Sequence, residues 1–197
     1  MNTQLFFSWL SILVYICGIT LYIYHSIRWK IIPHPFTWFI GMLFISLNIL
    51  PFFENSTQWS LAVVPLFLRF IVLMVWSLIG FYKISRLSLW VFDYFLLFCA
   101  ALILILMKLY SLNEIIFLII GVDFIAALPT VKKIILSPET EWSLIWFTTA
   151  LSIIFFLFSL DDPIYHWSIF WYYSILLNLS IGLLVLIRQS WVKIRIV

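Results

Sequence analysis

The chain has 197 residues, of which 65% are hydrophobic and only 10% charged, and its formal net charge is +3. A soluble domain of this length does not bury so large an apolar fraction, so the composition excludes an ordinary soluble globular protein and indicates a membrane protein. Both cysteines lie inside apolar runs, where we expect buried thiols rather than a disulfide or a metal site. No basic residue precedes the first apolar run, so we expect no cleavable signal peptide.

Apolar runs recur along the whole chain, each close to the roughly 20 residues that cross about 30 Å of hydrocarbon. They predict an all-α, polytopic membrane protein with seven transmembrane helices and short connections. Lys132 and Lys133 are expected to close the fifth helix, and Ser137-Pro138 to open a loop. The predicted spans are Leu5–Tyr24, Phe36–Phe53, Trp59–Tyr82, Leu89–Met107, Leu112–Val131, Trp142–Leu160 and Trp167–Ile187.

Basic residues gather on one side of this predicted topology. The side with the first, third and fifth connections and the C-terminus carries nine Lys and Arg residues, and the other side carries Lys108 beside Glu54, Glu114, Asp161 and Asp162. Because cytoplasmic loops are rich in Lys and Arg, we expect an external N-terminus and a cytoplasmic C-terminus in a bacterial inner membrane. The terminal WVKIRIV is expected to be a short basic cytoplasmic tail that contacts lipid.

Two stretches of the chain share a pattern. Residues 21–39 (LYIYHSIRWKIIPHPFTWF) and 128–147 (LPTVKKIILSPETEWSLIWF) each end an apolar helix, turn basic, pass a proline loop and re-enter an apolar run. With one gap, Trp38 aligns with Trp146, and the third and seventh spans both begin with Trp-Ser. The pattern predicts two parallel triple-helix bundles, 1–84 and 111–197, joined by a linker transmembrane helix, 85–110.

This layout, with LPTVKK at the end of the fifth span and IIPHPFTW at the entry of the second, resembles the SWEET and PQ-loop (MtN3-like) superfamily of small transporters. It is also similar to uncharacterised bacterial membrane proteins with a Pro-His-Pro-x-Ser/Thr-Trp signature. The resemblance implies alternating access around a midplane site, with an asparagine from the third helix of each bundle at the solute. Asn178 matches that pattern, whereas Arg69 stands in the counterpart region. The chain has no Pro-Gln dipeptide; the fifth span has Pro129-Thr130, and the first span has no proline.

Polar side chains at membrane depth are the main site candidates. Arg69 and Asp123 lie near the middle of the third and fifth spans, where charge is costly and needs a partner or a wet cavity. Two interpretations stay open: a structural ion pair between them, or a cavity in which Arg69 meets an anionic group and Asp123 couples protons. Asn48 and Asn178 either contact a polar solute or bond neighbouring helices together.

Aromatic residues and one proline complete the candidates. Most of the 11 tryptophans lie near span ends, as in an interfacial belt. Trp38 and Trp146 lie deeper, and either belong to that belt or sandwich a flat solute between the bundles. Pro129 cannot donate to the carbonyl of Ile125, so we expect a hinge in the fifth helix only. Neither metal-ligand spacing nor a nucleophile–base motif is visible, so we expect no cofactor, no metal and no enzyme.

These features predict a facilitative or proton-linked transporter of a small polar solute such as a sugar, a nucleoside or a vitamin precursor. The alternative is a non-transporting SWEET-like receptor or an accessory subunit of an envelope or lipid pathway. We expect membrane lipid as a partner and no nucleic acid, and homo-oligomerisation stays open. A polar cavity between the bundles would favour transport, and an aromatic-filled interface the alternative. The predicted solute contacts are Asn178, Arg69, Asp123, Trp38, Trp146 and Asn48, with Pro129 as the hinge.

Overall fold

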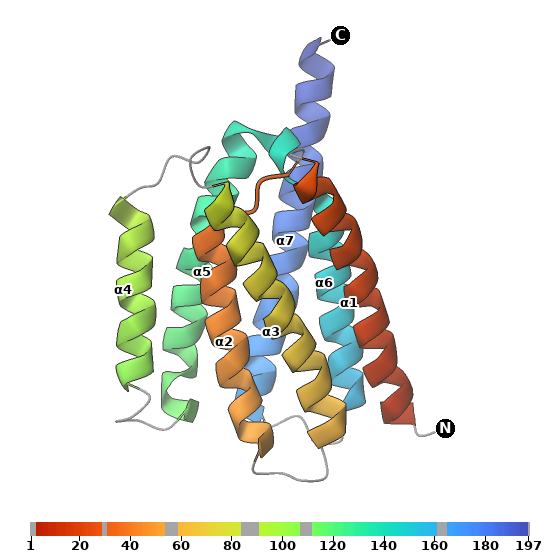
Figure 1. Cartoon of the computed structure of the whole chain (residues 1–197), viewed down its shortest axis with the longest axis vertical. Coiled ribbons are helices and arrows are strands. Elements are labelled where there is room, and N and C mark those ends of the chain that lie inside the picture. Colours follow the sequence, from red (N-terminus) through yellow and green to blue (C-terminus); the bar gives the residue numbers. More distant parts are fainter. Residues whose placement is uncertain are drawn as a thin grey trace.

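The computed structural model describes residues 3–28, 31–53, 59–83, 91–106, 112–160 and 165–196, and the side chains of several helical stretches, Asn48 among them, lie outside the description. The described chain is all-helical, as predicted, and its helices run up and down side by side (Figure 1). The seven α-helices of these residues are α1 (Thr3–Ile27), α2 (Pro35–Phe53), α3 (Trp59–Tyr82), α4 (Val91–Leu106), α5 (Leu112–Leu136), α6 (Ser143–Ser159) and α7 (Tyr165–Ile196), with a short 3-10 helix, η2 (Pro138–Thr140), before α6.

Helix α1 continues three residues past its predicted end, to Ile27, and the longer extensions beyond the predicted ends are in α5 and α7. Helix α5 does not close at Lys132 and Lys133 but continues to Leu136, because its first breaker is the Ser137-Pro138 pair, where the proline disfavours helix at the preceding residue. Helix α7 continues to Ile196, so the expected basic tail is largely a helical extension. This stretch contains neither glycine nor proline, so nothing in it ends the helix.

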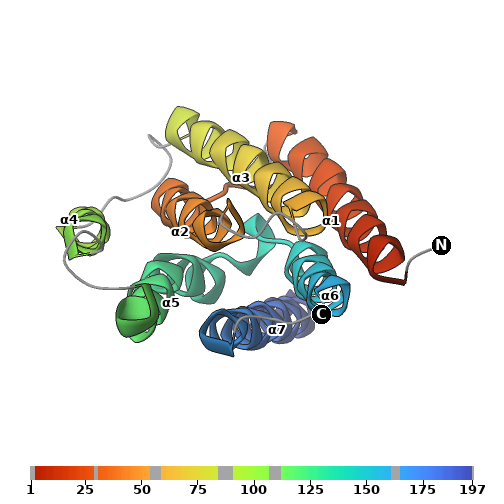
Figure 2. The same ribbon diagram turned by 90° about the horizontal axis from the view of Figure 1, so that it is seen from below.

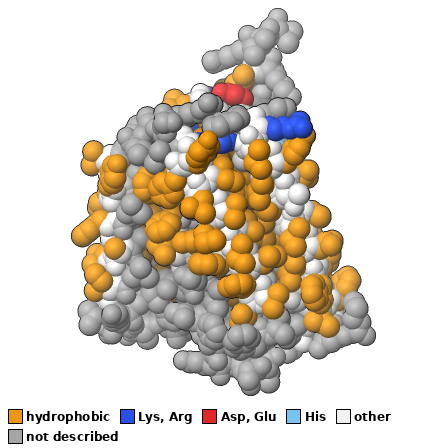
Figure 3. All heavy atoms as spheres, viewed as in Figure 1, with side chains coloured by type: hydrophobic (Ala, Val, Ile, Leu, Met, Phe, Trp, Pro, Cys, Tyr) orange, Lys and Arg blue, Asp and Glu red, His pale blue; other side chains and the backbone are white. Residues whose placement is uncertain are grey.

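The exterior of the described residues is suited to a lipid environment. Thr3–Ile27, Val63–Tyr82 and Ser168–Val192 are long and apolar enough to cross a membrane, and Pro35–Ile45 and Ser143–Ser159 are shorter apolar helices. Hydrophobic side chains cover the flank shown in Figure 3, whereas the coloured charged groups gather near the end that carries the C-terminus. Large apolar side chains such as Trp9, Leu78 and Phe117 are exposed. These features indicate membrane association, as predicted.

We call α1, α2 and α3 the first group of helices and α5, α6 and α7 the second group. Helix α3 packs against α1 and α2, and α7 packs against α5 and α6. Between the groups, α1 packs along α6 and α2 packs against α5, while α4 lies at the periphery against α5 and α2 (Figure 2). The C-terminal ends of α1, α3, α5 and α7 and the starts of α2 and α6 lie together, and we call this the basic end (Figure 1).

The contact between α1 and α6 depends on small residues. Ser11 Oγ donates to the carbonyl of Ser152 at 2.8 Å, and Ser152 Oγ donates to the carbonyl of Ser11 at 2.9 Å. Two turns along α1, Gly18 lies directly against Thr148 of α6. Small side chains let two helix backbones approach closely, and hydroxyl groups then bond across the contact. The α1–α6 pair is therefore a close, polar seam between the two groups.

Gly18→Ala should destabilise the fold. A Cβ at this position would lie 2.1 Å from Thr148 Oγ1 and 2.8 Å from Thr148 Cβ, so α1 and α6 would have to move apart. We expect a loss of about 1–3 kcal/mol. The matched control is Gly121→Ala, whose Cβ meets nothing within 4 Å and which should be neutral or slightly stabilising. Thermal unfolding in detergent measures both, and equal melting temperatures would contradict the close seam.

Candidate functional site

A cavity of about 120 Å³, which we call the central cavity, is lined by residues of α1, α2, α3, α5, α6 and α7. It therefore lies between the two groups of helices. Every predicted solute contact whose side chain is described lines it, each from a different helix: Trp38, Arg69, Asp123, Trp146 and Asn178. Residues more than a hundred positions apart in the sequence are thus brought to one place.

Arg69 is the most deeply buried charge in the wall of this cavity, with 3% of its surface exposed. Its Nη2 donates to the hydroxyls of Ser11 at 3.1 Å and Ser152 at 2.8 Å, the same pair that joins α1 to α6. The guanidinium carbon lies 5.1 Å from the ring centre of Phe156 and 5.8 Å from that of Trp171. Hydroxyl groups and aromatic faces therefore hold the cation in place.

Asp123 faces the same cavity from α5 and is half-buried. Its carboxyl group interacts with the hydroxyl of Tyr173 on α7, without a hydrogen bond of standard geometry. Within the described ranges no ion pair joins it to Arg69, whose contacts are with the two serines. The structural ion pair that the sequence left open is therefore not formed, and both charges line one cavity without neutralising each other.

Asn178 lines the central cavity from α7. Its Nδ2 donates to the carbonyl of Ser174, one turn earlier on the same helix, at 2.7 Å. The side chain thus bonds its own helix rather than a neighbouring one. Of the two interpretations of this amide, contact with a solute fits its position in the cavity wall. The other predicted amide, Asn48, has a side chain outside the described residues.

Trp38 and Trp146 are buried, with 8% and 5% exposed, so neither belongs to an interfacial belt. Their rings stack directly on each other, with centroids 5.3 Å apart and an angle of 21° between the planes. A flat solute between them would need about 7 Å, twice the usual contact distance. The expected sandwich is therefore not formed in this conformation. Because each ring lies in the first turn of its helix, the stack lies on the side of the cavity toward the basic end.

Pro129 is absent from the cavity wall and lies inside α5, which continues past it. The polar groups nearby connect α5 with α2. Thr37 Oγ1 donates to the carbonyl of Ala126 at 2.7 Å, and Thr130 Oγ1 donates to Thr37 Oγ1 at 3.2 Å. A threonine of the first group thus satisfies a helix carbonyl beside the proline. The hinge itself stays a prediction.

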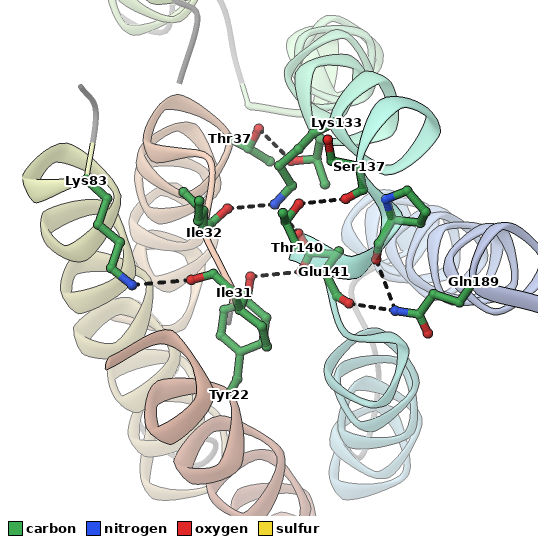
Figure 4. Close-up of polar contacts among 12 residues, drawn as sticks. Tyr22, Ile31, Ile32, Thr37, Lys83, Lys133, Ser137, Thr140, Glu141 and Gln189 are labelled. Atoms are coloured by element: carbon green, nitrogen blue, oxygen red, sulfur yellow. Dashed lines mark hydrogen bonds and ion pairs between the residues drawn. The ribbon is translucent and has the colours of Figure 1, made fainter. Parts of the chain in front are cut away.

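At the basic end, the connection after α1 is fastened to the connection after α5 (Figure 4). Lys133 and Glu141 form an ion pair, and Tyr22 donates its hydroxyl hydrogen to Glu141 Oε1 at 2.8 Å. Lys133 Nζ also donates to the carbonyl of Ile32 at 2.7 Å, and the Ile32 N–H donates to the carbonyl of Thr140 at 3.3 Å. We call these five residues the basic-end network.

Other side chains hold each of the two connections from its own group of helices. On α7, Gln189 Nε2 donates to the carbonyls of Pro138 at 3.0 Å and Glu141 at 2.9 Å. At the end of α3, Lys83 Nζ donates to the carbonyls of Ser26 and Ile31. The network thus joins the end of α1 and its connection to the end of α5 and its connection, and Glu141 is 2% exposed.

The sequence reasoning missed Tyr22, Glu141, Ser11 and Ser152. Glu141 lies in a stretch, PETEW, whose composition is that of a solvated loop, and serines inside apolar runs give little signal. The useful signal was position: Glu141 lies directly before the second re-entry of the repeat, where the two connections are expected to be equivalent. A carboxylate at that position, which follows the Lys132-Lys133 pair, indicates a contact between the two connections.

His34 lies beside this network, in the connection before α2, and is 5% exposed. Burial, and secondarily the charge of Lys133, lowers the pKa of its imidazole from the usual 6.5 to about 4. The folded protein therefore keeps His34 neutral at physiological pH. A second positive charge next to Lys133 is avoided in this way.

The Lys133–Glu141 pair should stabilise the fold through its charge balance. Removing one partner leaves the other buried without compensation, so Lys133→Ala and Glu141→Ala should each cost about 3–5 kcal/mol. The double variant should lose less than the sum of the two, because it leaves no unpaired charge. Thermal unfolding of all four proteins in detergent gives the coupling energy. Additive losses would show that the pair is not coupled.

Stability should fall on acidification because of His34. Between about pH 6.5 and pH 4 the unfolded chain binds the His34 proton and the folded chain does not, so stability is complete above about pH 6.5 and declines toward pH 4. His34→Gln removes this titration, and the difference in melting temperature between wild type and variant should change across that window. A difference that stays constant with pH would contradict the neutral, buried imidazole.

We compared the chain with protein-family models, with characterised proteins and with solved structures, and none of them matches it. A functional assignment therefore depends on the geometry of the central cavity and of the basic-end network.

Proposed function

We propose that the chain is an integral membrane transporter for a small polar solute. The observation that carries the proposal is the lining of the central cavity. The side chains that the sequence singled out, by their polarity or by their repeat position, line this cavity from both groups of helices. Polar side chains around a cavity between facing helix groups are typical of a solute site in a transporter. The proposed solute contacts are Arg69, Asp123 and Asn178.

The proposed architecture has seven spans in a 3-1-3 arrangement. Residues 1–84 (α1–α3) would form one triple-helix bundle, 85–110 (α4) the linker, and 111–197 (α5–α7) the second bundle. Two similarities in helix packing support it. Helix α3 contacts α1 and α2 in the way that α7 contacts α5 and α6. The contact of α1 with α6 in turn corresponds to the contact of α5 with α2. A further one is the stacking of Trp38 on Trp146, which are repeat-equivalent. We therefore propose membership of the SWEET and PQ-loop superfamily.

We infer that the protein lies in a bacterial inner membrane with its basic end in the cytoplasm, on the basis of the loop charges. In that orientation the conformation described here is closed to the cytoplasm, because the tryptophan stack and the basic-end network lie between the central cavity and that side. Opening would separate Tyr22 from Glu141 and Ile32 from Lys133 and Thr140. The Pro129 region of α5 would bend as the second bundle moves.

One observation favours the alternative, a non-transporting receptor or accessory subunit. Four aromatic side chains besides the stacked tryptophans line the cavity, namely Tyr15, Phe44, Phe170 and Trp171. A permanently closed aromatic core would hold a ligand or only support the fold. Alternating access distinguishes the two functions, since only a transporter has to open the basic end.

A disulfide across the two connections should block transport. In a background in which Cys17 and Cys99 are replaced by Ala, Ile32→Cys with Thr140→Cys places two thiols on residues already joined by a backbone hydrogen bond. Uptake into proteoliposomes is measured over a panel of sugars, nucleosides, vitamins, amino acids and small carboxylates. We expect oxidation to stop uptake and reduction to restore it.

The controls are the two single-cysteine proteins, which should transport under both conditions. Unchanged uptake in the cross-linked protein would exclude opening at the basic end. A folded protein that takes up no solute from the panel would favour the non-transporting alternative.

A further inference from the structure

The charge of Arg69 has no acidic partner among the described residues. Its Nη2 is occupied by two serine hydroxyls, whereas Nη1, although buried, has no hydrogen-bond partner. Neutral hydroxyls and aromatic rings orient a guanidinium, but they do not neutralise it. A buried cation without an anion is costly, because it has lost its water and gained no counter-charge.

The central cavity is the place next to Arg69 where an anion can lie. Arg69 belongs to its wall, and so does Asp123, the one acidic side chain of that wall. Because no ion pair joins the two within the described ranges, the cavity separates a cation from an anion. An incoming solute with a carboxylate would supply the missing partner for Arg69.

We propose that the central cavity takes a small solute through its carboxylate group, which binds the guanidinium of Arg69. This inference rests on the proposed function, since it names the class of solute for the same site. A charge-assisted hydrogen bond from Nη1 would complete the coordination of the guanidinium. The apolar body of the solute would lie against the aromatic walls, and an ammonium group, where the solute has one, would face Asp123.

The volume of the central cavity and the charge of Arg69 favour small monocarboxylates as the solutes. The cavity volume of about 120 Å³ is somewhat below the roughly 150 Å³ of an apolar cavity that accepts benzene, so about six non-hydrogen atoms fit. A phosphate dianion carries two negative charges and would need several donors. One available Nη and one uncompensated positive charge match a single carboxylate.

Binding to the purified full-length chain in detergent tests the proposal without any transport step. Isothermal titration calorimetry compares butanoate with butanamide, which has nearly the same shape but no charge, and with the zwitterions alanine and serine. We expect at least one carboxylate to bind at least about 10-fold more tightly than butanamide. A higher affinity for alanine than for butanoate would indicate an additional contact of the ammonium group with Asp123. A higher affinity for butanoate than for alanine would indicate that the protein recognises the carboxylate alone. Equal binding of butanoate and butanamide, or no binding of any carboxylate, would overturn the proposal.

Variants of Arg69 assign the contact. Arg69→Gln should weaken carboxylate binding about 10- to 100-fold, because it removes the charged partner of the carboxylate. Arg69→Lys should keep part of the affinity. Arg188→Gln, the same change at a half-buried residue outside the cavity, should bind as the wild type does.

A less stable Arg69→Gln protein that still binds butanoate like the wild type would make Arg69 structural and overturn the proposal. If that variant does not fold, the comparison of butanoate with butanamide on the wild-type protein still decides.

The result separates this inference from the transport proposal. Carboxylate binding that depends on Arg69, together with no uptake of any carboxylate, would uphold the carboxylate site and refute transport. Uptake of neutral solutes that is blocked by the Ile32–Thr140 cross-link, without carboxylate binding, would uphold transport and refute the carboxylate site.

Discussion

The centre of this protein depends on the burial of one guanidinium group inside an apolar helix bundle. Arg69 has lost its water, so its hydrogens need partners from the protein, and Ser11 and Ser152 provide two. The same serines exchange hydrogen bonds with each other's backbone, so the residue of α3 is attached to the seam between α1 and α6. One charge thereby joins three helices of both groups and borders the cavity between them.

In the basic-end network the ion pair lies within one of the two groups of helices. Both members of the Lys133–Glu141 ion pair belong to the α5–η2–α6 stretch, whereas the first group contributes the Tyr22 hydroxyl and the backbone of Ile32. Moving the groups apart would break a backbone hydrogen bond of about 1 kcal/mol and two hydrogen bonds to charged groups of about 1.5–3 kcal/mol each, and would leave the ion pair intact. If the pair spanned both groups, opening would strand two buried charges, at far greater cost.

The two stretches that share a sequence pattern, 21–39 and 128–147, differ in the groups that they bring into contact. The tryptophans that this pattern aligns, Trp38 of α2 and Trp146 of α6, stack on each other. The contacts of the two stretches are unlike: α1 and the connection after it offer the Tyr22 hydroxyl and the Ile32 carbonyl, whereas α5 and the connection after it offer the charges of Lys133 and Glu141. A proline is present in α5 and absent from α1, and Thr37 of the first group satisfies a carbonyl beside it. The differences in sequence between the two stretches thus bring unlike groups into contact, a hydroxyl and a carbonyl from one stretch and charged groups from the other.

The sequence by itself determined the helical class, the membrane character and most helix positions, because apolar runs of spanning length and charged breaks between them are local signals. It also identified five residues that line the central cavity, because a charge, an amide or a repeat position within an apolar run can be recognised one residue at a time. These residues are Arg69, Asp123, Asn178, Trp38 and Trp146. It did not determine that α5 and α7 continue past their basic residues, because Lys and Arg are compatible with helix and only glycine or proline ends it locally. Nor did it pair Tyr22 with Glu141 or Arg69 with two serines, and it left the Arg69–Asp123 ion pair open. The tertiary structure decided those partners, because they depend on which helix faces meet between the two groups. Packing between residues that are far apart in the sequence gives no local sequence signal.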